Sequence, residues 1–215
     1  IQHITHEIRT PVTLILAPVE EIMRQKNIPE EIRDDLEVVK RNSERLLDLV
    51  NQILDFTKAE QEAFSSQNTW FDIDDLVEKT VQRFTPAAQQ KGIQLSHDTP
   101  QPIRICTDRE ALTKVLSNLL TNAMKFTKDR ILVSLTENPE AHTVTISVED
   151  NGTGIKPTEK EKIFNLFYQS ANKPQLPNKG FGIGLAIVSL LVKRMMGKIE
   201  VESEENRFTR FRITL

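Results

Sequence analysis

The chain has 215 residues, of which 38% are hydrophobic and 27% charged, with a net charge of -3 and a pI near 5.9. This composition is ordinary for a globular protein of one large domain or two small ones. It argues against a nucleic-acid surface, and no apolar run approaches the roughly 18 residues of a membrane span. We therefore expect this fragment to bind no nucleic acid and to make no direct contact with a membrane. The single cysteine, Cys106, excludes an internal disulfide. It lies in the apolar stretch 103–106, so we expect it to pack rather than react.

The first sixty residues contain no glycine and carry hydrophobic residues at helical spacing. The pattern breaks at residues 27–30, so residues 1–60 are predicted to form an all-α helical hairpin. Its apolar faces are too broad for two helices to bury alone. We therefore predict a homodimer in which two hairpins form a four-helix bundle. The chain starts at Ile1 already in helical phase, which indicates a piece of a longer protein.

The first predicted helix places a histidine, a carboxylate, a hydroxyl and a proline close together, as His6, Glu7, Thr10 and Pro11. A proline inside a helix removes one backbone hydrogen bond and crowds the carbonyl four residues earlier. A bent helix with a reactive side chain before the bend would present a nucleophile. Alone, the segment is also compatible with a metal ligand, a general base or an accident of packing.

A different pattern begins after a polar stretch, residues 61–69, which we interpret as a linker. Residues 70–215 are predicted to form an α+β domain, a sandwich in which helices cover one face of a mixed sheet. We expect helices near residues 74–90, 110–126 and 184–196. We expect strands at residues 93–97, 103–107, 131–135, 143–150, 198–203 and 210–215.

The predicted helix over residues 109–126 carries Asn118, Asn122 and Lys125 on the face opposite its apolar stripe. Amide oxygens bind hard cations and lysine meets phosphate, so this face suits a magnesium nucleotide. A solvated polar face is the simpler explanation when the stretch is taken alone.

The predicted strand 143–150 ends in Asp150, which falls on the apolar side of the alternation. A buried carboxylate needs a donor, and the amino group of adenine would serve. Gly152 and Gly154, followed by Ile155, would allow a tight turn against a flat ligand. A hairpin turn capped by the aspartate explains the segment equally well.

Three of the seven glycines cluster as Gly180, Gly182 and Gly184, at the start of a predicted helix. Backbone amides at a helix N-terminus form an anion site. The spacing is not that of a Rossmann fingerprint, and no Walker A sequence is present; a glycine-rich turn without a ligand is the alternative. The long stretch 156–179 before it has the length of a lid, and its aromatic residues 163–168 either anchor that lid or belong to the core.

Together, these segments resemble the catalytic core of a sensor histidine kinase of two-component signalling, over essentially the whole chain. Residues 6–11 match the H box of the dimerisation and histidine-phosphotransfer domain. The second module resembles a Bergerat-type ATP-binding domain, and its boxes occur in the order and at the spacing of the family. These are the N box at residues 118–125, the first glycine box at 150–154, the F box at 164–168 and the second glycine box at 180–185.

The resemblance implies that the second domain binds Mg²⁺ and ATP. Asn122 would be the principal magnesium ligand, supported by Asn118, while Lys125 would meet phosphate and Asp150 the adenine amino group. The other residues that the resemblance places at the nucleotide are Gly152, Gly154, Ile155, Phe167, Tyr168, Lys179, Gly180, Gly182, Gly184, Leu185 and Thr209. The chain departs from the family at its last glycine box, where Asn206-Arg207-Phe208 replaces the usual glycine before Thr209.

The same resemblance implies that His6 accepts the γ-phosphate of ATP, with Glu7 as its general base. The phosphoryl group would pass to an aspartate of a response-regulator receiver domain, and Thr10 would support a reverse phosphatase activity. The fragment would be the cytoplasmic portion of a membrane-anchored sensor. A dimeric pseudokinase scaffold is one alternative, which His6, Glu7, Asn122 and Asp150 disfavour. A Bergerat-type ATPase of the chaperone or gyrase kind is another, but such proteins need no phosphotransfer hairpin.

Overall fold

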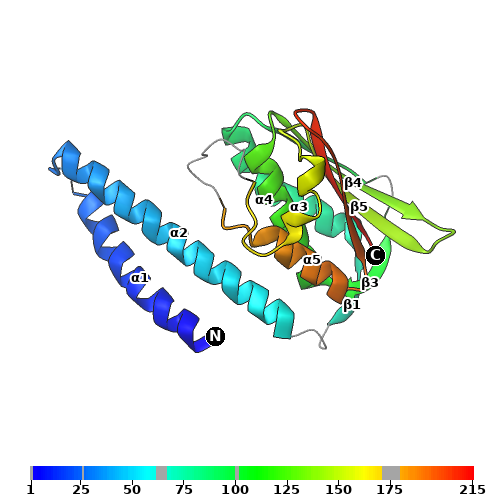
Figure 1. Cartoon of the computed structure of the whole chain (residues 1–215), viewed down its shortest axis with the longest axis horizontal. Coiled ribbons are helices and arrows are strands. Elements are labelled where there is room, and N and C mark those ends of the chain that lie inside the picture. Colours follow the sequence, from blue (N-terminus) through cyan, green and yellow to red (C-terminus); the bar gives the residue numbers. More distant parts are fainter. Residues whose placement is uncertain (1, 26, 62–66, 100–101, 171–179) are drawn as a thin grey trace. The chain divides into compact units, whose positions relative to one another are not determined.

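The chain folds into two compact units, residues 1–60 and 61–215 (Figure 1). The computed structural model describes residues 2–25, 27–61, 67–99, 102–170 and 180–215, with the side chains of residues 2–7 and 61 excepted. Within the described ranges, no helix combines the length and the apolarity that crossing a membrane requires.

The first unit is a helical hairpin, as predicted. It consists of α1 (Gln2–Met23) and α2 (Glu30–Gln61). The α1 helix continues through Pro11 and Pro18 as one element. Two acidic residues begin α2, Glu30 and Glu31, where the positive end of the helix dipole favours them.

The contact between the two helices is narrow. Val12, Val19 and Val50 are each less than a tenth exposed, and Arg9 Nη2 donates a hydrogen bond to Asn51 Oδ1 at 2.8 Å. Many large apolar side chains of the hairpin remain exposed: Ile8, Leu14, Ile15, Ile22, Ile32, Val38, Val39 and Leu46. One hairpin therefore leaves much of its apolar surface uncovered.

The second unit is built on a mixed sheet, as predicted, and this sheet has five strands; the strand predicted at residues 103–107 forms but lies outside it. Its strands, in spatial order, are β2 (Gln94–Asp98), β4 (Arg130–Asn138), β5 (Thr143–Asp150), β7 (Phe208–Thr214) and β6 (Lys198–Glu204). The β2 strand runs parallel to β4, and the remaining neighbours are antiparallel. A separate two-stranded sheet pairs β1 (Asn68–Asp72) with β3 (Arg104–Asp108).

Three helices cover one face of the large sheet (Figure 1): α3 (Ile73–Gln90), α4 (Arg109–Phe126) and α5 (Gly184–Arg194). The core lies between them and the alternate strand residues, so that Val144, Ile146 and Val148 of β5 are buried while their neighbours are half-exposed. Two short 3₁₀ turns, at residues 157–159 and 162–164, lie between β5 and α5 in the chain.

The opposite face of the sheet is polar. Arg210 of β7 donates hydrogen bonds to Glu149 of β5 at 2.6 Å and to Glu202 of β6 at 3.0 Å. Arg212 of β7 also donates a hydrogen bond to Glu202. Ion pairs of this kind between facing residues of adjacent strands stabilise a solvated sheet face modestly.

The β1 strand was not predicted from the sequence. Asn68 and Thr69, which we assigned to the linker, are the first two residues of that strand. Its residues show little alternation in burial, because only Phe71 is buried. The strand forms by pairing with β3, more than thirty residues later in the chain, and local periodicity does not report such a partner.

The expectation that Cys106 is a packing residue is wrong: its side chain is exposed. Cys106 lies directly opposite Trp70, itself 66% exposed, in the two-stranded sheet. Alternation along β3 turns Thr107 inward and Cys106 outward.

A candidate nucleotide-binding site

The α4 helix separates an apolar face from a polar one, as its sequence predicts. Asp108 caps the helix, accepting a hydrogen bond from Ala111 N on Oδ1 at 2.9 Å. The buried stripe includes Leu112, Leu116 and Leu119, each at most 1% exposed. The polar face carries Asn118, Asn122 and Lys125, which are half-exposed.

The second glycine segment lies against this polar face. A Cβ added to Gly184, the first residue of α5, would lie 2.9 Å from Asn118 Oδ1, and one added to Gly180 would lie 3.2 Å from Lys125 Nζ. The fold thus brings together two segments that lie about sixty residues apart in the sequence. Glycine at both positions leaves space beside the amide and the ammonium, and a larger side chain would fill that space.

Gly182 is required for a different reason. It has φ +74°, and a Cβ there would lie 2.5 Å from the carbonyl oxygen of Tyr168. Phe167 N donates to Gly182 O at 2.9 Å, and Gln169 Nε2 donates to Gly180 O at 2.9 Å. These bonds hold the end of the aromatic segment against the start of the glycine segment.

The aromatic residues before the glycines divide between core and surface. The rings of Phe164 and Phe211 meet edge to face at 6.3 Å, whereas Phe167 is 57% exposed and has φ +63°. Tyr168 Oη donates to Glu159 Oε1 at 3.1 Å. Desolvation raises the pKa of Tyr168, and the bond to Glu159 raises it further, so the phenol is neutral at physiological pH.

Asp150 is buried at the end of β5, on the helix-covered face, as the alternation predicts; it is 5% exposed. Its Oδ1 accepts a hydrogen bond from Gly152 N at 2.9 Å. A Cβ on Gly152 would lie 2.0 Å from the carbonyl oxygen of Phe126, so the first glycine segment packs directly on the end of α4. Gly154 has φ +67°, and a Cβ added there would lie 2.2 Å from Glu204 O.

Thr209 lies directly opposite Asp150 in the pairing of β5 with β7, and it is also 5% exposed. Asn206 takes φ +61°, a conformation that asparagine tolerates better than most residues. Asn206 N donates to Thr153 O at 2.8 Å, which ties this turn to the first glycine segment. The departure from the family's glycine box therefore leaves Thr209 beside Asp150.

Two further residues organise this region: Asn151, which lies within the first glycine box but was given no role there, and Ser203, which belongs to no predicted motif. Asn151 Oδ1 accepts hydrogen bonds from Thr127 Oγ1 at 2.9 Å and from Arg130 N at 3.0 Å, fixing the turn between α4 and β4. Ser203 Oγ accepts from Ile155 N at 2.9 Å and lies 3.3 Å from Thr209 Oγ1. The sequence carries little signal for either role, because Asn151 bonds Thr127, 24 residues away, and Ser203 bonds Ile155, 48 residues away.

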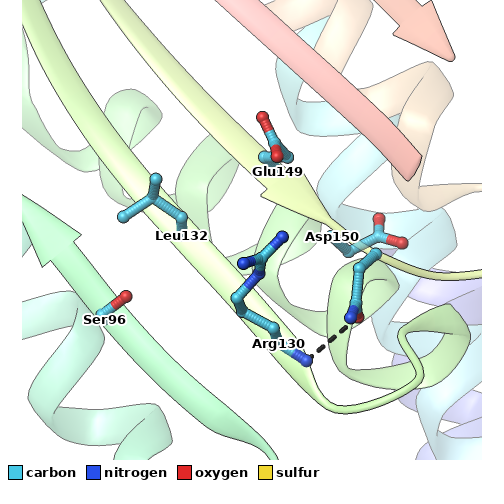
Figure 2. Close-up of a pocket in the computed structure, with 6 residues that line it drawn as sticks. Ser96, Arg130, Leu132, Glu149 and Asp150 are labelled. Carbon is cyan, nitrogen blue, oxygen red and sulfur yellow. Dashed lines mark hydrogen bonds between the residues drawn. The ribbon is translucent and has the colours of Figure 1, made fainter. Parts of the chain in front are cut away.

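A cavity of about 190 Å³ lies behind this region, on the other face of the sheet (Figure 2). It is lined by Ser96, Arg130, Leu132, Glu149, Asp150 and Asn151. Arg130 and Leu132 flank the buried Ile131, so their side chains point to the face opposite the helices. The cavity is therefore not part of the space between α4 and the glycine segments.

The structure leaves some predicted site residues untested. The side chains of His6 and Glu7 and the whole of Lys179 lie outside the described residues. Thr10 is exposed on α1, in the other unit, while Ile155 is 8% exposed and Leu185 half-exposed. Among the described residues, no three histidine, cysteine, aspartate or glutamate side chains cluster to hold a metal. The side-chain amides of Asn118 and Asn122 carry oxygens of the kind that a hard cation binds.

Two family models match the chain. Residues 1–62 match the His Kinase A (phospho-acceptor) domain, and residues 107–215 match the histidine kinase-, DNA gyrase B- and HSP90-like ATPase.

Individual proteins match over nearly the whole chain. The sensor histidine kinase YcbM of Bacillus subtilis is 31% identical, over 99% of this chain and 69% of its own length. The autoinducer 2 sensor kinase/phosphatase LuxQ of Vibrio parahaemolyticus is 31% identical over 98% of this chain, which spans 25% of that protein. The crystal structure of full-length ShkA in complex with AMPPNP is similar with a TM-score of 0.82 and 28% identity, over 99% of this chain and 44% of that one.

Proposed function

Because the chain belongs to the sensor histidine kinases, it is a protein-histidine kinase with an ATP-binding domain, and we propose how its residues divide the work. ATP bound to residues 61–215 phosphorylates His6 of α1. The phosphoryl group then passes to an aspartate of a response-regulator receiver domain.

One observation carries the assignment of the nucleotide site. The second glycine segment approaches the polar face of α4 at two points, Gly184 against Asn118 and Gly180 against Lys125. Amide groups, an ammonium and glycine backbone at the start of a helix are together suited to phosphate oxygens. A merely solvated face of α4 would require no glycine opposite these side chains.

Asp150 supplies the base-recognition end of the site. Its carboxylate is buried, so it requires hydrogen-bond donors, and the exocyclic amino group of adenine is one. Guanine presents an acceptor at the corresponding position and would be rejected. Thr209 lies directly opposite Asp150 and would support the same contact.

The amide oxygens of Asn118 and Asn122 fit magnesium, a hard cation, and would hold it beside the phosphates. When bound, the ion would neutralise charge on the phosphate oxygens. Lys125 adds a fixed positive charge to the same region. Phosphoryl transfer requires chiefly this neutralisation and in-line positioning.

His6 is the acceptor in this proposal. An imidazole with its usual pKa of about 6.5 is largely neutral at physiological pH, so it carries a lone pair for attack. The new nitrogen–phosphorus bond forms as the bond from the γ-phosphorus to the bridging oxygen breaks, and ADP leaves. The proton on the other ring nitrogen passes to Glu7, the general base.

We also propose that the hairpin dimerises through its exposed apolar side chains. Ile8, Ile15 and Ile22 recur every seven residues on α1, and Ile32, Val39 and Leu46 do so on α2. Seven-residue spacing places each set on one stripe of its helix. Two hairpins packed as a four-helix bundle would cover both stripes.

Thr10 and the cellular setting complete the proposal. Thr10 lies one helical turn after His6 and is exposed, so it can position water for dephosphorylation of the receiver domain. A relative named as a kinase/phosphatase supports this second activity. The fragment is proposed to be the cytoplasmic portion of a membrane-anchored sensor.

Incubation with γ-labelled ATP and Mg²⁺ tests the assignment of the acceptor, with His6→Ala as the matched variant and nucleotide binding measured on both. We expect acid-labile, alkali-stable label on the unmodified chain and none on His6→Ala, which should bind ATP equally. Label retained on His6→Ala would show that another residue accepts the phosphoryl group. ATP binding without any label on the unmodified chain would favour the dimeric pseudokinase scaffold instead.

A further inference from the structure

A buried ion pair joins the end of α5 to the start of α4. Arg194 Nη2 donates to Asp108 Oδ2, and the two side chains are 9% and 8% exposed. The other carboxylate oxygen of Asp108 accepts from Ala111 N, in the first turn of α4. A single carboxylate therefore bonds both helices.

The same two helices meet again at the candidate nucleotide site, where Gly184 lies against Asn118. Ten residues separate Asp108 from Asn118 along α4, and ten residues separate Gly184 from Arg194 along α5. Each interval corresponds to about 15 Å of helix. The two helices are thus antiparallel neighbours that are in contact at two points. The distance between these two points is the same along α4 as along α5.

This matched spacing makes the ion pair a constraint on sliding. A shift of α5 along α4 would separate Arg194 from Asp108 and would move Gly184 away from Asn118 by the same amount. The buried side chains of the two helices between these points are apolar, and dispersion contacts between such side chains are not directional. The hydrogen bond between Arg194 and Asp108 is directional, and breaking this buried ion pair would leave a charge without its partner.

We propose that Asp108 and Arg194 are positioning residues of the kinase reaction: they set the axial position of α5 on α4 and thereby place the glycine turn for the phosphates of ATP. The inference rests on the proposed nucleotide site. It differs from a contribution to stability alone, because buried ion pairs often stabilise no more than apolar residues of similar volume.

The test compares nucleotides with and without phosphates on the full chain. We would measure the dissociation constants of ATP and adenosine by calorimetry, well below the unfolding temperature of each variant, together with kcat and KM for ATP. For Arg194→Met, ATP should bind about tenfold more weakly, the scale of one lost hydrogen bond to a charged group. Adenosine, held at the Asp150 end, should bind with unchanged affinity.

Three further variants keep the test decisive. Asp108→Asn retains the cap oxygen but not the charge, and should change ATP binding in the same direction even if Arg194→Met does not fold. Arg194→Lys should recover most of the lost affinity. Ile213→Val, a buried change in β7, should lower stability without altering the ratio of ATP to adenosine affinity.

The outcomes separate the inference from the function on which it rests. A folded unmodified chain that binds no ATP would overturn the nucleotide site itself. If the unmodified chain binds ATP, an unchanged ratio of ATP to adenosine affinity in Arg194→Met and Asp108→Asn overturns the positioning role. Equal weakening of both nucleotides would also overturn it, because that is the result of general destabilisation.

Discussion

Asp150 and Thr209 face each other across β5 and β7, and both are 5% exposed although both are polar. Two buried polar side chains in register, beside the turn made by Gly152, are costly to a fold unless they bind something. Both side chains have partners within the protein. Asp150 accepts a hydrogen bond from Gly152 N, and Thr209 Oγ1 lies 3.3 Å from Ser203 Oγ. In the proposed site, the edge of an adenine ring would lie beside these two side chains.

Asp150→Asn should weaken ATP binding by about tenfold to a hundredfold, the worth of a hydrogen bond to a charged group. Its amide retains an oxygen for Gly152 N but presents the adenine amino group with a weaker acceptor. Glu149→Gln is the matched control, because Glu149 is the adjacent residue and lies on the other face of the sheet. Calorimetry that gives the same ATP affinity for both variants would remove Asp150 from base recognition.

Asn206 offers a test of the departure from the family's glycine box. Its φ of +61° is a left-handed conformation, which glycine adopts freely and alanine only at a cost of about 1 kcal/mol. Asn206→Gly should therefore leave both the free energy of unfolding and ATP binding nearly unchanged, whereas Asn206→Ala should lower the former by about 1 kcal/mol. Denaturant titration measures this difference. If Asn206→Gly alone weakens ATP binding, the asparagine side chain has a role of its own.

The features that were predicted correctly from the sequence are those that follow from a pattern among neighbouring residues. The polar face of α4 and the inward position of Asp150 both follow from the period of a helix or a strand, and burial confirms both. The family resemblance then supplied roles that the period could not, since Asn118 and Asn122 alone fit a solvated face equally well.

What sequence missed depends on partners that are distant in the chain. The β1 strand exists because it pairs with β3, and Cys106 is exposed because its side chain lies on the outward face of that sheet, opposite Trp70. The bond between Asp108 and Arg194 joins residues 86 positions apart. No local pattern marks arginine near the end of a helix as buried, because a basic residue there usually interacts with the helix dipole at the surface.

A charge in the exposed apolar stripes should prevent dimerisation. Ile15 is 49% exposed on α1, and Ile15→Lys would place an ammonium in the proposed contact between hairpins. Light scattering at micromolar concentration should report a dimer for the unmodified chain and a monomer for Ile15→Lys. Glu37→Lys, at an exposed polar position of α2, should remain dimeric. A monomeric unmodified chain would contradict the four-helix bundle.

Thr10→Ala should separate the two proposed activities. Autophosphorylation of His6 should continue, because Thr10 takes no part in the transfer from ATP. Dephosphorylation of a phosphorylated receiver domain should slow by about tenfold or more, the scale of a lost water-positioning contact. Thr13→Ala, three residues further along the same helix and also exposed, is the control. Undiminished dephosphorylation in Thr10→Ala would count against the phosphatase role.

Gly184→Ala tests the contact that carries the nucleotide site. The added Cβ would lie 2.9 Å from Asn118 Oδ1, so the amide must move away from the position proposed for magnesium and phosphate. Alanine also favours helix by up to about 1 kcal/mol over glycine, so the variant should unfold no more easily than the unmodified chain. We expect ATP to bind at least about tenfold more weakly, because a 1 Å displacement of a binding group can cost more than that.

Gly92→Ala provides the matched comparison. Gly92 has φ +68° with no atom within 4 Å of an added Cβ, so alanine there strains the backbone without touching the site. It should lower the free energy of unfolding by about 1 kcal/mol and leave ATP binding intact. We thus expect opposite effects from the two glycine variants. Gly184→Ala should lose ATP affinity and keep its free energy of unfolding, whereas Gly92→Ala should lose stability and keep its ATP affinity. Normal ATP affinity in Gly184→Ala would mean that the space beside Asn118 is not where the nucleotide binds.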